Sequence, residues 1–221
     1  MHQLKRSCPS NTHIPHDLLM LFLLVHVTIC ADIASEVQTM PPPKSSREIY
    51  ETFEQHELIP DLLDVAPNRT LQVTFGSEHF VNLGNFLLPD IWTEKPSAVL
   101  LNVPEDKMYV FLMTEIDFPT RENPHRTEWF HWLVGDIPGR NFSRGFTYMV
   151  YVGPATRDTS GIHRIAFLLM EQLDGKISYE EKHMTTTFNH RKRGSISTRK
   201  FIEKYNLTQP LAANFFLTGY K

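Results

Sequence analysis

Acidic residues and histidines interrupt three apolar segments, and these residues have the chemistry to form a site. Glu115 and Asp117 follow the apolar segment 108–114 and stand two residues apart. In an extended chain their carboxylates therefore point the same way. His131 and His163 each lie at the entrance of another apolar segment. Imidazoles donate hydrogen bonds to anions, and a nearby carboxylate favours their charged form. Two carboxylates and two histidines, all at strand ends in one small domain, favour a single shared site.

The same residue types also suit other roles. A single histidine at a strand end is usually a satisfied structural residue, and a carboxylate after a strand usually forms a turn or a cap. Together, two carboxylates and two histidines have the chemistry for acid–base catalysis or for binding a divalent metal. No serine or cysteine nucleophile accompanies them in these segments.

Short apolar segments separated by turn-forming residues predict the elements that must position these side chains. Segment 71–75 alternates apolar and polar residues, as a half-buried strand does. Segment 108–114 is almost entirely apolar, which indicates a central strand buried on both faces. Further strands are expected at 98–103, 130–134, 146–152 and 165–171. Asn-Pro, Pro-Gly, Gly-Pro and Asp-Gly pairs punctuate the connections. The pattern predicts a mainly β domain, an antiparallel β-sandwich with a few short peripheral helices.

Two helices are predicted by their capping residues. Ser45 and Glu48 form a capping box before a short helix that ends near residues 58–60 and places Ile49 and Phe53 on one face. Near the C-terminus, Ser197 caps a second helix, in which Phe201 and Tyr205 lie four residues apart on one face.

The first residues have the anatomy of a secretory signal peptide. Two basic residues, an apolar run at 18–29 and the small residues Cys30 and Ala31 follow one another, so residues 1–31 are expected to be cleaved. A buried or anchoring N-terminal helix is the alternative. Residues 32–47 are a polar, proline-bearing linker, and residues 48–221 are the folded domain. Both cysteines, Cys8 and Cys30, belong to the leader, so the mature domain is expected to fold without a disulfide.

Export agrees with three N-glycosylation sequons, at Asn68, Asn141 and Asn206, although Asn206 follows the late helix closely. The formal charge of −3 gives no global basic field for nucleic acid. The basic run 190–193 lacks interleaved aromatic residues, so it is interpreted as a solvated loop, with processing by a dibasic protease as a lesser alternative.

The polar segments also resemble a family signature. Glu115-Ile-Asp117-Phe-Pro119, Trp129-Phe-His131 and Gly161-Ile-His163-Arg164 are similar to the Asp-Pro-Asp-x-Pro, Trp-x-His and Gly-x-His-Arg motifs of the phosphatidylethanolamine-binding protein family, also called the Raf-kinase-inhibitor-protein family. The resemblance runs in unbroken order over residues 48–221. The chain departs from the pattern at Glu115, where the family usually has aspartate, and at Ile116, where it has proline.

The resemblance implies an antiparallel β-sandwich with one small pocket that accepts phosphate or a phosphoethanolamine head group. Its expected lining residues are Glu115, Asp117, Pro119, His131, Pro154 and His163. It implies a non-catalytic binding protein that needs no cofactor or metal and makes transient contact with a membrane surface. With the leader and the sequons, the chain is expected to be a secreted member of this kind. Because family members resemble inhibitors of kinases and serine proteases, an extracellular regulator such as a serine protease inhibitor is the alternative.

Overall fold

A computed structural model describes residues 39–154, 161–180 and 192–220. The predicted leader therefore lies outside the described residues. The compact unit that contains the sheets begins at Met40. None of the helices in the described part of the chain is long and apolar enough to cross a bilayer.

Two sheets form the domain. The larger has six strands in the order β3-β9-β8-β5-β6-β7, and the smaller has three in the order β2-β1-β4. The six-stranded sheet is antiparallel except where β3 runs parallel to β9. Its strands are β3 (Asn85–Phe86), β5 (Met108–Glu115), β6 (Trp129–Pro138), β7 (Phe146–Met149), β8 (Gly161–Glu171) and β9 (Ala212–Tyr220). The smaller sheet contains β1 (Gln72–Phe75), β2 (His79–Phe80) and β4 (Ala98–Leu100).

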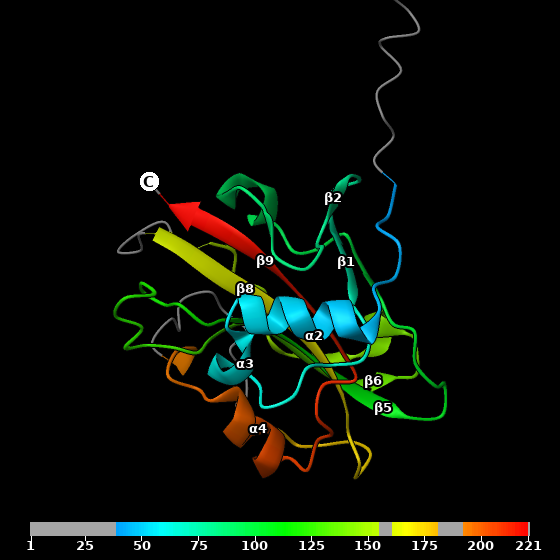
Figure 1. The fold of residues 1–221 in the computed structure, drawn as a ribbon. Helices are drawn as coiled ribbons and strands as arrows, with labels where there is room; N and C mark the ends of the chain where they lie inside the picture. The colour runs from blue at the N-terminus through cyan, green and yellow to red at the C-terminus, as the bar shows by residue number, and fades with distance from the viewer. Residues whose placement is uncertain (1–38, 155–160, 181–191, 221) are drawn as a thin grey trace, which may run out of the picture. The chain divides into compact units, whose positions relative to one another are not determined.

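Helices cover one face of the larger sheet, and the smaller sheet covers the other. Alternate residues of β5 point to opposite faces, so Val110 and Leu112 join one core cluster while Phe111 and Met113 join the other. The first cluster also includes residues of α2 (Ser46–Gln55), α3 (Leu58–Asp61) and α4 (Thr198–Lys204). Figure 1 shows α2 lying across β8 and β9. The second cluster fills the space between the two sheets.

The helix caps form as predicted. The Ser45 side chain accepts a hydrogen bond from the backbone N–H of Glu48, and the Glu48 carboxylate accepts one from the Ser45 backbone N–H, which completes the capping box. Ile49 and Phe53 are fully buried on one face of this helix. The Ser197 side chain caps α4 by accepting from Lys200 N–H.

Candidate functional site

Three adjacent strands bring Glu115, His131 and His163 together. Glu115 is the last residue of β5, and β6 and β8 flank that strand. In the register of β5 and β8, Glu115 lies opposite Ile165, so the side chain of His163 two residues earlier is on the same face. That face looks toward the smaller sheet, because Ile165 belongs to the core cluster between the sheets. We call these three residues the triad.

A β-bulge turns His131 toward the same face. Met113 pairs with Trp132, whereas Thr114 pairs with Phe130, so His131 is the extra residue at this register shift. In a regular strand, neighbouring residues point to opposite faces, and a bulge breaks that alternation. His131 thus lies on the inter-sheet side together with Trp132. No pattern in the sequence predicts this β-bulge, because it depends on how β6 pairs with β5.

The triad is closely hydrogen-bonded and buried. The two Glu115 carboxylate oxygens receive one histidine each: Oε2 lies 2.9 Å from His131 Nε2, and Oε1 lies 2.6 Å from His163 Nδ1. The other ring nitrogen of His131, Nδ1, lies 2.7 Å from the Val152 carbonyl oxygen. The three side chains are only 3%, 1% and 0% exposed, respectively. A shielded setting of this kind strengthens each of these contacts.

Glu115 is the anion of the triad. Burial by itself raises the pKa of its carboxyl group, but hydrogen bonds from both histidines and their positive charge outweigh burial and hold the pKa below its usual value. The two ring nitrogens of His131 face two oxygen atoms, one of the Val152 carbonyl and one of the Glu115 carboxylate.

Trp92 packs against the triad, and no sequence pattern singled it out as a site residue. It ends the 3-10 helix η1 (Pro89–Trp92) and is fully buried. Its ring packs edge-on against His131 with centroids 5.4 Å apart, and its Nε1 donates to Thr218 Oγ1 at 3.2 Å. The hydroxyl of Tyr151 donates to the Trp92 carbonyl oxygen. Aromatic packing therefore fixes the histidine ring in place.

Asp117 lies apart from the triad and binds Arg164 instead. Its Oδ1 accepts from Arg164 Nη2 at 2.7 Å, and its Oδ2 accepts from Nε at 2.9 Å and from the backbone N–H at 2.8 Å. Arg164 also donates to the carbonyl oxygens of His56 and Glu57 and pairs with Asp61. The strand ends at Glu115, so the alternation that placed both carboxylates on one side does not extend to Asp117.

The two predicted prolines lie in loops. Pro119 follows a cis peptide bond after Phe118, and Pro154 is the last described residue before segment 155–160. Both are half-buried. Neither proline takes part in the side-chain contacts given above between Glu115 and the two histidines, or between His131 and the Val152 carbonyl.

The prediction of a solvated basic loop at 190–193 was wrong for Arg193, whereas residues 190–191 lie outside the described residues. Arg193 is fully buried. Its guanidinium donates to the carbonyl oxygens of Phe130, His131 and Val150 at 2.8–3.1 Å. Burial lowers the pKa of this group to about 10, which still leaves it charged at neutral pH. Arg193 thus supports the backbone of the strand that carries His131, and its basic neighbours in the sequence concealed this role.

Glu128 is a second buried carboxyl group, just before β6. It is 7% exposed, and its Oε2 accepts from the backbone N–H of Thr198, the first residue of α4, at 2.8 Å. Burial raises its pKa to about 7, although the hydrogen bond to Thr198 and the charge of Arg199 act in the opposite direction. Glu128 therefore titrates near neutral pH, which Glu115 does not.

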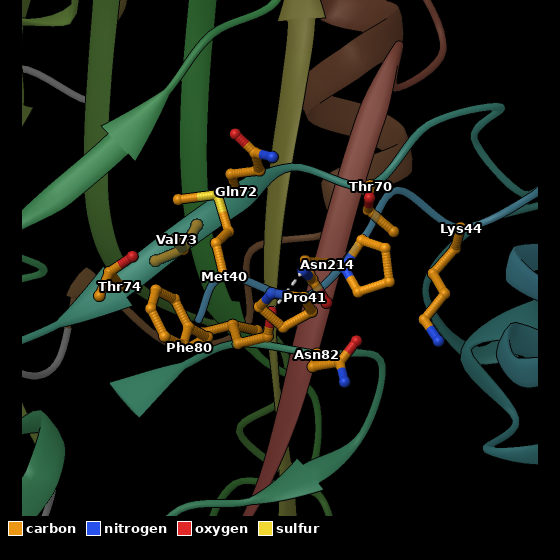
Figure 2. Close-up of a pocket in the computed structure, with 12 residues that line it drawn as sticks. Met40, Pro41, Lys44, Thr70, Gln72, Val73, Thr74, Phe80, Asn82 and Asn214 are labelled. Carbon is orange, nitrogen blue, oxygen red and sulfur yellow. Dashed lines mark hydrogen bonds between the residues drawn. The ribbon is translucent and has the colours of Figure 1, made fainter. Parts of the chain in front are cut away.

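The described cavities lie elsewhere. Figure 2 shows one of about 20 Å³, where Met40 and Pro41 lie over β1 beside Phe80 and Asn214. A second, of about 120 Å³, extends from Lys44 to Leu169, and a groove beside α2 forms a third. None of these three includes a triad residue. Among the described residues, no group of three or more histidine, cysteine, aspartate or glutamate side chains is arranged to hold a metal ion.

The fold and the motif positions agree with comparisons to known proteins. The family model for phosphatidylethanolamine-binding proteins matches residues 63–216, which include all three triad residues. The chain belongs to the phosphatidylethanolamine-binding protein family. The family prediction made from the three polar motifs is thereby confirmed, as is the mainly β fold with few helices.

Individual relatives differ in what their names say they do. The chain is 30% identical to the Drosophila melanogaster protein named "Putative odorant-binding protein A5" over 78% of this chain and 80% of that one. A phosphatidylethanolamine-binding protein from Plasmodium vivax has a similar structure, with a TM-score of 0.62 and 21% identity over 82% of this chain and 100% of that one. A carboxypeptidase Y inhibitor in complex with its cognate proteinase matches with a TM-score of 0.66 and 24% identity over 80% and 97%. These names describe binding proteins and an inhibitor.

Proposed function

We propose that this member of the phosphatidylethanolamine-binding protein family is a secreted, non-catalytic binding protein that accepts a small anion or a phospholipid head group at the triad. One observation carries the proposal. Imidazole nitrogens from β6 and β8 converge on one carboxylate, 2.9 and 2.6 Å from its two oxygens. The backbone therefore already holds a pair of donors at the spacing of an oxyanion, and phosphate and carboxylate ligands present the same oxygens.

A zwitterionic head group fits the charges of the site. A phosphate oxygen can take hydrogen bonds from His131 or His163, while an ammonium group can pair with Glu115. A ligand embedded in a bilayer would bring the protein into transient contact with a membrane surface. The named relatives bind ligands or inhibit a proteinase, which supports a role without catalysis.

Removing either histidine is expected to weaken head-group binding by about 10- to 100-fold, because one hydrogen bond to a charged group contributes about 1.5–3 kcal/mol. Isothermal titration calorimetry with phosphoethanolamine would compare wild type with His131→Ala and His163→Ala. His125→Ala is the matched control, since His125 is an exposed loop residue. Absence of saturable binding by wild type, or equal binding by all four proteins, would reject the triad as the ligand site.

An extracellular regulator of proteases is the second candidate, favoured by the structural similarity to the carboxypeptidase Y inhibitor. At 24% identity, the similarity shows a shared fold, so inhibition itself must be tested by experiment. A panel of serine proteases and serine carboxypeptidases would be assayed with micromolar protein. Full residual activity of every enzyme would remove this candidate.

Secretion rests on the leader-like segment 1–31 and on the sequons. N-terminal sequencing of protein from culture medium is expected to show a start near residue 31 or 32. Protein that keeps Met1 and stays inside the cell would contradict secretion.

The three sequons are expected to differ in use. Asn68 and Asn141 are exposed in loops, and the Ser143 hydroxyl donates to Asn141 Oδ1 at 2.8 Å. Asn206 is also exposed, but its Nδ2, the atom a glycan would occupy, already donates to Asp174 Oδ2 at 3.0 Å. We expect Asn68→Gln and Asn141→Gln each to reduce the glycan mass removable by an amidase, and Asn206→Gln to leave it unchanged. A lower glycan mass in the Asn206→Gln protein would contradict this difference.

A further inference from the structure

Glu115 occupies the position that an external anion would need. Each of its oxygens takes one histidine, and the histidine nitrogens that face the site are both engaged by it. The side chains are almost completely buried, and the three described cavities lie elsewhere in the domain. An incoming anion therefore meets donors that already hold a carboxylate of the same chemistry.

When ionised, the Glu115 carboxylate has the same charge and the same oxygen acceptors as a carboxylate ligand. Its pKa is held below the usual value by the two histidines despite burial, so it carries its negative charge at neutral pH. A second anion beside it would suffer like-charge repulsion in a shielded environment. Binding of an external oxyanion and contact of Glu115 with both histidines thus exclude each other.

We propose that Glu115 is a built-in anion that keeps the site self-occupied, and that external oxyanions bind the two histidines only by displacing its carboxylate. This inference rests on the triad being the ligand site of the proposed function. The Glu115 carboxylate lies between the two rings, with one oxygen on each. Glu115 then sets the affinity of the site, because every ligand must compete with it.

The size of the Glu115 carboxylate group predicts which small anions can replace it. Glu115→Ala keeps Cβ and removes one methylene and the carboxylate, which together have the size and charge of acetate. The variant leaves two buried imidazole donors facing an empty space of that shape. Acetate and the smaller formate are expected to fill it, whereas butyrate is too long. Glu115→Gln keeps the side-chain volume and removes only the charge, so it is the matched control that leaves no space.

The experiment measures thermal unfolding of purified full-length protein at pH 7 with acetate, formate or butyrate, each against sodium chloride at equal ionic strength. At an anion concentration about 100 times Kd, ligand binding is expected to raise the Tm of Glu115→Ala by about 5 °C or more. Wild type and Glu115→Gln are expected to shift by less than about 1 °C. The double variant Glu115→Ala/His131→Ala is expected to lose the response.

Each outcome decides the proposal. If Glu115→Ala unfolds without acetate, recovery of its folded circular dichroism spectrum in acetate supports the built-in anion, and failure of both acetate and formate to restore it overturns the proposal. A folded Glu115→Ala whose Tm responds to acetate no more than wild type also overturns it, as does a response that persists without His131.

Failure of the proposed function gives a different result. If wild type binds no phosphoethanolamine but acetate stabilises Glu115→Ala, head-group binding is rejected. Glu115 as the built-in anion is then retained. If wild type and Glu115→Ala bind phosphoethanolamine equally tightly, the proposed function is retained. Competition between the Glu115 carboxylate and an external anion is then overturned.

Discussion

Replacing Asp117 with alanine is expected to lower the free energy of unfolding by about 3–5 kcal/mol, because it removes the buried carboxylate partner of a buried guanidinium. The side chains of Arg164 and Asp117 are only 3% and 2% exposed. Three hydrogen bonds from Arg164 to the Asp117 carboxylate disappear together in this variant. Urea denaturation followed by circular dichroism would measure the loss.

A second aspartate on the same arginine provides the matched control. Asp61 Oδ2 lies 2.9 Å from Arg164 Nη2, but the Asp61 side chain is 42% exposed. Exposed ion pairs contribute at most about 1 kcal/mol, so Asp61→Ala is expected to cost no more than that. Equal losses for Asp61→Ala and Asp117→Ala would show that burial does not control the strength of this network.

The domain is expected to lose stability as the pH rises from about 4.5 to about 7 through Glu128. Its folded-state pKa of about 7 lies above the unfolded value of 4.5, so the folded state binds the proton more tightly. Stability from this group is complete below the unfolded pKa and is lost as the pH passes the folded pKa. At about 1.4 kcal/mol per pKa unit, the full contribution is about 3 kcal/mol.

Glu128→Gln isolates this effect. The amide keeps an oxygen for the Thr198 N–H and cannot ionise, so its stability is expected to stay flat where that of wild type falls. Glu115 acts in the other direction, because its lowered pKa gives stability that is present above 4.5 and lost on acidification below that value. Denaturant titrations of both proteins between pH 4 and 8 would measure the difference. Parallel curves for wild type and Glu128→Gln would contradict the assignment.

Features encoded by neighbouring residues could be predicted from the sequence. The capping box at Ser45 and Glu48 needs only residues three apart, and the apolar run of β5 marks a strand buried on both faces wherever it lies in the sheet. Glu115 and both histidines, which the structure brings into contact, were also selected from the sequence, because polar residues at the ends of apolar strands stand out. These predictions depend on periodicity and on short spacing.

Features that depend on distant partners could not be predicted in this way. Asp117 does not join the triad, because β5 ends at Glu115 and the Asp117 carboxylate binds Arg164 instead. The bulge at His131 is defined by pairing with β5. Trp92 contacts the triad from the 3-10 helix η1, nearly forty residues earlier in the sequence than His131. Arg193 sits in a basic run that indicates solvent exposure, yet backbone carbonyl groups of two strand regions enclose it.

The Arg164 network also has a kinetic consequence. Arg164 joins carbonyl groups 108 and 107 residues earlier and a carboxylate 47 residues earlier. Closing such long loops lowers the entropy of the chain before the new contacts can stabilise it. These hydrogen bonds are therefore expected to form late in folding. A contact absent from the folding transition state restrains unfolding and leaves the folding rate almost unchanged. We therefore expect the contacts of Arg164 to slow unfolding. Loss of Arg164 would raise the unfolding rate of the domain more than it would lower the folding rate.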